Sequence, residues 1–135
     1  FKAGFGQGTS IAKITDGTSS TLMLSEVLGD ESSGDARGGW IIAAMGSSSF
    51  SAKFPPNSAG TDVIPMCEEN IPISNPMKCT ENRGNGQVWA AARSAHPGGV
   101  NASKCDGSVQ FYSVAIAPAV WQALATRNGD EVIKQ

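Results

Sequence analysis

The sequence predicts an α+β domain that is mostly antiparallel β, with short helices and long loops. Its 135 residues include 16 glycines and 7 prolines but only 16% charged residues, a composition typical of short strands joined by turns. The Asp106-Gly107 pair separates two alternating runs, as in a β-hairpin. A chain of this length can bury a sizeable core, so we expect a single domain over residues 1–135.

The first half of the chain is predicted to contain two core strands. Ile11 and Ile14 indicate a short strand or a single helical turn, and Asp16 is placed to cap the polar turn that follows. The apolar run LMLSEV then predicts a strand over residues 21–27. The run WIIAAM predicts a fully buried strand over residues 40–45.

Residues 46–86 are rich in Ser, Pro, Asn and Gly and are predicted to form a long loop or insertion. A loop of this length is usually a functional surface, so we expect variable binding chemistry here. Cys67 and Cys79 flank its segment CEENIPISNPMKC, which a disulfide closes readily. We expect this disulfide, with reduced buried thiols as the alternative, and Cys105 as the third cysteine. The disulfide would place the protein outside the cytoplasm.

The second half is predicted to contain a strand over residues 87–92 and a hairpin. A type I′ turn at Asp106-Gly107 requires positive φ at both central residues and pairs Lys104 with Val109. This register puts four apolar side chains on one face, which we assign to the core. They are Val100, Ala102, Val109 and Phe111.

A short helix is predicted after the hairpin, in APAVWQALATRNG, and DEVIK is predicted as a final strand or extended tail. Pro118 suits its first turn and Gly129 supplies its stop. Its apolar face consists of Ala117, Val120, Trp121 and Leu124.

Charge and hydropathy exclude two classes of partner. A net charge of −2 and a pI near 5.3 offer no basic surface for a nucleic-acid backbone. No apolar run approaches the roughly 18 residues of a membrane span, so we expect no membrane contact from this chain. No signal-peptide pattern is present either, so we expect either a protein that is soluble as made or a targeting segment that lies outside the sequence.

The sole histidine, His96, is the sharpest candidate for a functional residue. In the hairpin, residues 100–106 are extended, which separates the strand's two ends by roughly 20 Å. His96 and Asp106 would then not touch, and a catalytic dyad requires hydrogen-bonding distance. We therefore expect a structural role for His96, with metal ligation and catalysis as alternatives. The cysteine spacings contain no zinc motif, and no metal site is predicted.

Calcium is the cofactor that the sequence leaves open, because its oxygen ligands form no motif. The candidate ligands are Asp30, Glu31 and Asp35, or Asp62, Glu68 and Glu69. We expect these residues to form solvated acidic loops instead, and no cofactor is predicted.

Glu26 stands at the end of the first apolar strand. It is interpreted either as a buried carboxylate paired with Arg37 or Arg93, or as the point where the strand reaches solvent.

Four blocks, ITDGTSSTLMLSE, DARGGW, ARSAHPGGVNASKCDGSVQFYS and VWQALATRNGDEVI, occur in series along the chain. Together they resemble the C-terminal part of a planctomycete family of pilin-like proteins, marked by His, nine residues and Asp-Gly (DUF1559). The resemblance implies a type IV pilin or type II secretion pseudopilin architecture, in which a long N-terminal helix precedes a β-rich head. The family gives none of the motif positions an established catalytic role. They correspond here to His96, Asp106, Gly107, Asp16, Gly17, Thr18 and Glu26.

The sequence departs from the family pattern in two ways. It lacks the N-terminal helix, so we expect it to be the C-terminal fragment of a longer protein. It also has Ser103 and Lys104 where relatives carry apolar strand residues, which predicts a hairpin that is more solvated or covered by a partner.

We therefore expect a non-enzymatic, extracytoplasmic pilin- or pseudopilin-like subunit at the cell surface, with other protein subunits as partners. The alternative is a secreted module that binds a small solute or carbohydrate, with or without calcium, through residues 46–86. Phe50, Phe54 and Trp89 in one cleft would favour it. An enzyme is the third hypothesis, and it would need a pocket joining His96 to Glu26 or Asp35 within about 3 Å.

Overall fold

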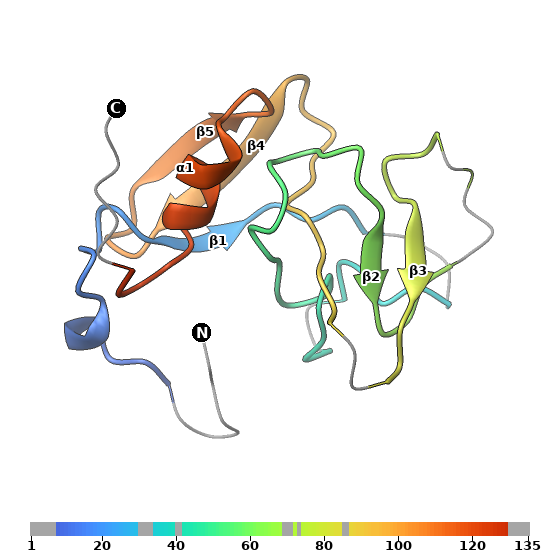
Figure 1. The fold of residues 1–135 in the computed structure, drawn as a ribbon, viewed down its shortest axis with the longest axis horizontal. Helices are drawn as coiled ribbons and strands as arrows, with labels where there is room; N and C mark the ends of the chain where they lie inside the picture. Colours follow the sequence, from blue (N-terminus) through green and yellow to red (C-terminus); the bar gives the residue numbers. More distant parts are fainter. Residues whose placement is uncertain are drawn as a thin grey trace.

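The computed structural model describes residues 8–29, 34–39, 42–68, 72, 74–84 and 87–129. This part contains a three-stranded antiparallel sheet in the order β1-β4-β5 and a two-stranded parallel sheet of β2 and β3 (Figure 1). Helix α1 lies over the larger sheet. The elements are η1 (Ile11–Lys13), β1 (Leu22–Ser25), β2 (Asp62–Ile64), β3 (Cys79–Glu81), β4 (Gly99–Lys104), β5 (Val109–Ser113) and α1 (Pro118–Ala123).

The mostly antiparallel β class with a short helix is confirmed. The strand predicted over residues 21–27 is present as β1, and the turn at Ile11 is helical, as one of its two interpretations had it. Pro118 opens α1 as predicted, because its missing N–H is not needed in a first turn. The helix ends at Ala123, before the predicted stop at Gly129. No helix in the described ranges is long and apolar enough to span a bilayer.

The hairpin loop consists of Cys105, Asp106 and Gly107, so the predicted type I′ turn of two residues is wrong. Lys104 N–H donates to the Ser108 carbonyl at 2.9 Å, and these residues therefore face each other across the loop. Gly107 has a φ of 86°, whereas Asp106 does not have the positive φ that a type I′ turn needs. A glycine in the left-handed region after a type I turn is the next most common way to close a hairpin.

This loop shifts the pairing of β5 by one residue and exchanges its two faces. Val100 pairs with Tyr112. Because side chains alternate along a strand, a one-residue shift moves each of them to the other face. Val100 and Ala102 are buried as predicted, but Val109 and Phe111 are 69% and 48% exposed, so their assignment to the core is wrong.

The main core lies between α1 and the face of the sheet that carries Tyr112, which we call the inner face. Trp121 is completely buried and meets Tyr112 edge-on, with ring centroids 5.4 Å apart. Phe50 packs against Trp121 from the loop before β2, at 6.4 Å. Such aromatic pairs add about 0.5–1.5 kcal/mol to the burial of their area. The other buried members of this cluster are Leu22, Ala92, Val100 and Ala102.

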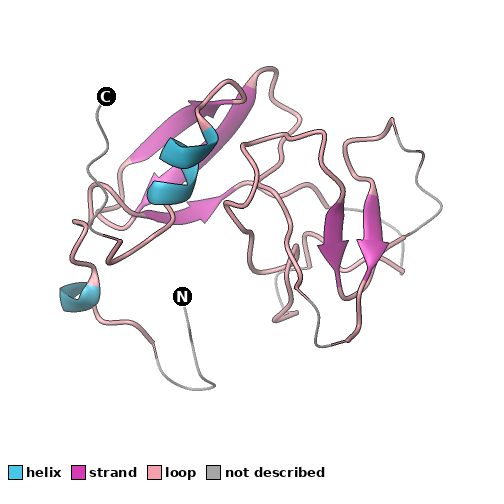
Figure 2. Cartoon of the chain, viewed as in Figure 1, coloured by secondary structure: helices cyan, strands magenta, loops and turns pink. Residues whose placement is uncertain are grey.

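Three further predictions need correction, all in the part of the chain where loops predominate (Figure 2). Trp40 and Ile41 lie outside the described residues, but residues 42–45 form no strand, and Ile42 is exposed. Residues 46–86 are not one loop, because they contain the parallel strands β2 and β3.

Residues 87–92 are extended but join the smaller sheet only through a single bridge between Val63 and Trp89. Elsewhere this segment bonds to loops and to the Asp62 side chain instead of forming a ladder. The Ala90 and Ala92 carbonyls accept the N–H groups of Ser51 and Asn57.

The observed register predicts unequal effects of two substitutions on β5. Tyr112→Ala should lower the free energy of unfolding by about 3–5 kcal/mol, because it empties the space beside Trp121. Val109→Ala should change it by no more than about 0.5 kcal/mol, because the side chain is exposed. Urea unfolding of both variants measures the difference. A larger loss for Val109→Ala would restore the register expected from a type I′ turn.

Candidate functional site

The Arg93 side chain is almost fully buried, and it donates hydrogen bonds to a carboxylate and to two backbone carbonyls. Its Nε and one terminal nitrogen each donate to the Asp62 carboxylate at 2.9 Å, which makes a bidentate ion pair. It also donates to the carbonyls of Ser58 at 2.6 Å and Gly60 at 2.8 Å. These bonds tie the extended segment after Trp89 to β2 and the loop that precedes it.

A second buried pair adjoins the first. Arg37 donates to both carboxylate oxygens of Asp35, at 2.9 and 2.6 Å, and approaches Asp62 at 3.6 Å. The four side chains therefore alternate in charge, in the order Asp35, Arg37, Asp62, Arg93, and we call them the ionic core. Buried charges are tolerated only when paired and hydrogen-bonded. Each of the four has such a partner.

The ionic core corrects several predictions. Asp35 and Asp62 do not lie in solvated acidic loops, since both are buried against arginines. The interpretation that pairs Glu26 with Arg37 or Arg93 is also wrong, because the side chains of these arginines pair with Asp35 and Asp62. Among the other candidate calcium ligands, Glu68 is half-buried beside Asp35, to which its N–H donates. Asp30, Glu31 and Glu69 lie outside the described residues.

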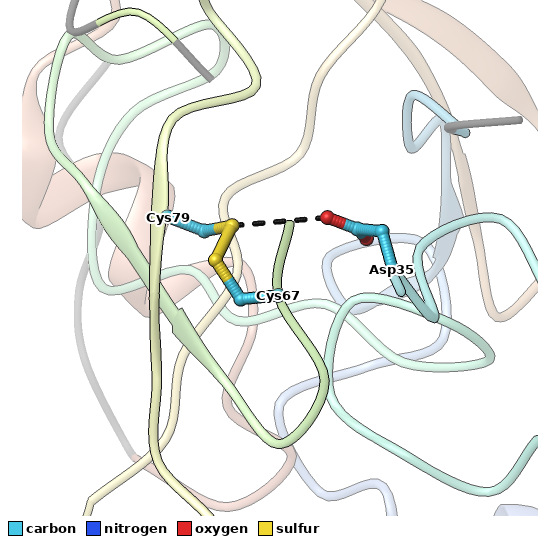
Figure 3. A group of neighbouring side chains, drawn as sticks. All are labelled: Asp35, Cys67 and Cys79. Atoms are coloured by element: carbon cyan, nitrogen blue, oxygen red, sulfur yellow. Dashed lines mark hydrogen bonds between the residues drawn. A yellow bond between two sulfur atoms is a disulfide. The ribbon is translucent and has the colours of Figure 1, made fainter. Parts of the chain in front are cut away.

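The predicted disulfide between Cys67 and Cys79 is present beside the ionic core, and Cys105 is free. The Cα atoms of the pair are 6.0 Å apart, within the usual range for disulfides. Arg37 donates an N–H to the Cys79 sulfur at 3.2 Å. Figure 3 shows an Asp35 oxygen facing the same sulfur, at 3.7 Å. The disulfide thus packs against Asp35 and Arg37, at one end of the ionic core.

The potential ligand atoms of Asp35, Cys67 and Cys79 lie within 4.8 Å of one another, as in a metal site. Metals bind the thiolate form of cysteine, however, and both sulfurs are joined in the disulfide. The carboxylate is also held by Arg37. In this oxidised state the cluster anchors the fold and presents no thiolate ligand.

Asp35 has a lowered pKa. Its burial alone would raise the pKa of the carboxyl group, because the charged form loses its hydration. Hydrogen bonds from the Arg37 side chain, from the Arg37 N–H and from the Glu68 N–H outweigh this effect and favour the carboxylate. The ionised form is therefore the one that the folded protein stabilises.

Glu26 joins two of the sequence blocks on which the family resemblance rests, ITDGTSSTLMLSE and ARSAHPGGVNASKCDGSVQFYS. Its carboxylate accepts the Asn101 N–H at 2.7 Å and lies 3.1 Å from the His96 Nε2. Partial burial would raise the pKa of Glu26, but the Asn101 hydrogen bonds and His96 lower it overall. The Glu26 carbonyl also accepts the Arg93 N–H at 2.9 Å, so the end of β1 is bonded directly to the ionic core segment.

The contact between His96 and Glu26 meets the distance that the enzyme hypothesis required. The two side chains are 55% and 33% exposed, and neither lines the two clefts described below. His96 is positioned in the turn before β4, where its N–H donates to the Ser94 hydroxyl.

The remaining motif residues fasten turns to neighbouring segments. The Asp106 carboxylate accepts the N–H and hydroxyl of Ser108, and the Asp106 N–H donates to the Thr18 carbonyl. Asp16 was predicted to cap its own turn. In the structure the Asp16 carboxylate accepts the Thr126 hydroxyl at 3.1 Å and the Gly129 N–H at 2.9 Å, which holds the segment after α1.

Two clefts open on the described surface. The larger, of about 860 Å³, runs between β5, α1 and the turn at residues 16–20. The smaller, of about 450 Å³, lies between β1 and residues 47–52. Its lining contains no charged residue.

The three aromatic residues that would have favoured a binding module do not share one cleft. Phe50 lines the smaller cleft and packs on Trp121. Phe54 contacts Trp89 instead, with ring centroids 6.5 Å apart. The Lys53 ammonium covers the Trp89 ring at 3.0 Å from its centroid, so this face already has a cationic partner.

Sequence reasoning missed the ionic core, although one signal for it was present. Arg93 directly follows the run Ala90–Ala92, and a charge next to a run of small apolar residues is expected to need a buried partner. Which carboxylate would pair with it was not readable, because Asp62 is separated from it by the intervening loops.

Comparison with known proteins identifies a family. A family model described as a protein of unknown function (DUF1559) matches residues 3–119. No curated protein and no solved structure matches the chain.

The ionic core predicts that Asp35→Asn lowers the stability of the fold by an amount that depends on pH. At pH 7 the substitution should lower the free energy of unfolding by about 3–5 kcal/mol, because it leaves Arg37 buried without its closest partner. The native carboxyl group has a lowered pKa, so its stabilisation is present above the unfolded value of about 3.9 and is lost as pH falls through the native value. Urea titrations at pH 7, 5 and 3 should show the gap between wild type and variant closing at low pH.

Glu81→Gln is the control, because Glu81 pairs with Arg83 at the surface. It should leave the free energy of unfolding unchanged within error. An Asp35→Asn loss as small as that of the control, or a gap that stays constant with pH, would contradict the assigned role of the ionic core.

Proposed function

We propose that this chain, which belongs to the DUF1559 family of proteins of unknown function, is a non-enzymatic, pilin- or pseudopilin-like structural or interaction subunit. It acts outside the cytoplasm, at the cell surface, and its partners are other protein subunits. The observation that carries this proposal is an exposed apolar surface on the larger sheet.

This surface is the side of the sheet turned away from Tyr112 and α1, which we call the outer face. Three large apolar side chains on it are exposed: Leu24 (62%), Val109 and Phe111. Ser103 of β4 pairs with both Leu24 and Val109, and therefore lies between them. The strand residues of this face carry no charge. Large apolar side chains that are exposed together on one face are typical of sites of protein contact.

The motif residues support a structural role. Glu26, His96 and Asp106 bond to segments distant in sequence and line neither cleft. Asp16 lines the larger cleft, but its carboxylate accepts two hydrogen bonds from the segment after α1. Residues that hold the backbone in place are what a subunit with a rigid contact surface requires.

The proposed location rests on the disulfide. Disulfides persist in oxidising compartments and are rare in reducing ones. The bond between Cys67 and Cys79 is consistent with a protein that works outside the cytoplasm.

A second function is favoured by the smaller cleft. Its volume of about 450 Å³ falls in the range of small-molecule sites. Serine side chains, Phe50 and apolar residues of β1 line it, and Leu24 is one of the latter. The absence of charge among the lining residues favours a neutral ligand, since an ion would lose its hydration uncompensated. A neutral sugar, with hydroxyl groups and an apolar face, fits this chemistry.

Leu24→Asp tests assembly through the outer face. In cells that make the whole protein, the variant should reduce the share recovered in surface assemblies at least tenfold, because a buried unpaired charge is costly. Immunoblots of sheared surface fractions measure this share. Ile11→Asp, also at an exposed apolar residue, is the control and should assemble normally. Normal assembly of Leu24→Asp would remove the outer face as the contact surface.

Calorimetric titration with neutral mono- and oligosaccharides tests the second function. Saturable binding should occur, and Met23→Asp should weaken it at least tenfold by placing a charge at the wall of the cleft. Ile11→Asp again serves as the control. An absence of heat with all neutral sugars, or equal binding by both variants, would reject the cleft as a sugar site.

A further inference from the structure

Strand β5 has an open edge. It is the last strand of its sheet, and its outer side pairs with no strand in the described ranges. Lys104 N–H bonds to Ser108 and Val114 N–H bonds to Gly98, which fixes the residues that face β4. Because hydrogen bonding alternates along antiparallel strands, the N–H groups of Val109, Phe111 and Ser113 point away from β4, as do their carbonyls.

Strand β5 itself has none of the charges, prolines or bulges that normally prevent pairing. Edge strands are commonly protected by charges, proline, bulges or covering segments. Residues 109–113 read VQFYS, contain no charge or proline, and pair with β4 in an unbroken register. The opposite edge differs, because β1 has an irregularity between Leu22 and Leu24, and the Leu22 N–H is occupied by the Leu124 carbonyl.

The surroundings of β5 also leave room for a strand from another molecule and carry little charge that would repel it. The larger cleft runs along this strand, with Phe111 and Ser113 among its lining residues. The side chains of Val109 and Phe111 are exposed. The strand is uncharged and the whole chain carries a net charge of only −2, so two copies would meet here with little repulsion.

We propose that β5 pairs in antiparallel fashion with β5 of a second copy of this chain, about a twofold axis at Phe111. The two Phe111 residues then exchange N–H···O=C bonds. The Ser113 N–H of each copy donates to the Val109 carbonyl of the other. The Ser113 carbonyl already accepts the Ile116 N–H, so it is not needed for pairing. The two sheets become one continuous sheet of six strands, β1-β4-β5 from each copy.

The size of the contact sets its strength. One short strand from each copy buries less than the roughly 1,200 Å² of a standard stable interface, so the dimer is weak in dilute solution. Neighbouring subunits held together on a surface raise the effective concentration and favour it. The inference deepens the proposed function and rests on it in naming a second copy as one partner. Leu24 lies on β1, the edge strand opposite β5. A variant at Leu24 therefore tests the outer face without changing the β5 edge.

Cysteine pairs test the register directly, in a chain with Cys105→Ser. Facing Cα atoms in a hydrogen-bonded pair are about 5.5 Å apart, which a disulfide spans. Phe111→Cys should therefore form a covalent dimer under mild oxidation. Val109→Cys alone should not, because the two positions would lie about 13 Å apart along the strands. The double variant Val109→Cys/Ser113→Cys should cross-link again. Non-reducing electrophoresis reports all three.

Sedimentation from about 10 μM to about 1 mM tests the pairing without cysteines. The chain should dimerise with rising concentration, and Phe111→Pro should weaken this at least tenfold by removing the outward N–H. The substitution spares every bond to β4, and Phe111→Thr, which keeps the N–H, should weaken dimerisation less than threefold. Leu24→Asp should dimerise like wild type even if assembly in cells fails.

Three results would overturn the inference. They are a monomer at every concentration, equal dimerisation by Phe111→Pro and wild type, or cross-linking of Val109→Cys as efficient as that of Phe111→Cys. Attachment of Phe111→Cys in cells to a different protein, with no homodimer, would also overturn it, and would leave the proposed subunit function intact.

Discussion

The rest of the structure depends on the buried guanidinium of Arg93. Its side chain binds Asp62 and the loop before β2, while its backbone N–H binds the end of β1 at Glu26. One residue therefore connects the larger sheet to the part of the chain that has little secondary structure. That part cannot rely on an extensive hydrogen-bonded ladder, because β2 and β3 are short (Figure 1). Charge pairing and the disulfide supply the missing constraint.

Buried ion pairs such as these specify a geometry more than they add stability. A buried ion pair contributes little net free energy compared with apolar packing, but losing one partner is costly. It also demands close approach. Gly46 has a φ of 87°, and a Cβ there would lie 2.9 Å from the Arg37 side chain and 3.3 Å from Ile64. The glycine therefore permits the turn and the packing together, which leaves few other sequences compatible with this part of the fold.

The motif residues act on the larger sheet as the ionic core acts on the smaller one. Glu26 and His96 join the end of β1 to the turn before β4, and Asp106 and Asp16 fasten the turns at the opposite end. The sheet held in this way has an outer face with exposed apolar side chains and an open edge at β5. A scaffold that is rigid around exposed apolar surface suits protein–protein contact better than chemistry, and this is why both proposals address assembly.

The sequence by itself determined the class of the fold, the family, β1, the start of α1, the hairpin and the disulfide, because each depends on local patterning or on a short loop. Tertiary structure alone decided the register of β5, since a loop that includes Cys105 turns Tyr112 inward. It also decided the partners of Arg93 and Glu26. Pairing between distant charges depends on how loops bring them together, and no spacing along the chain encodes that distance.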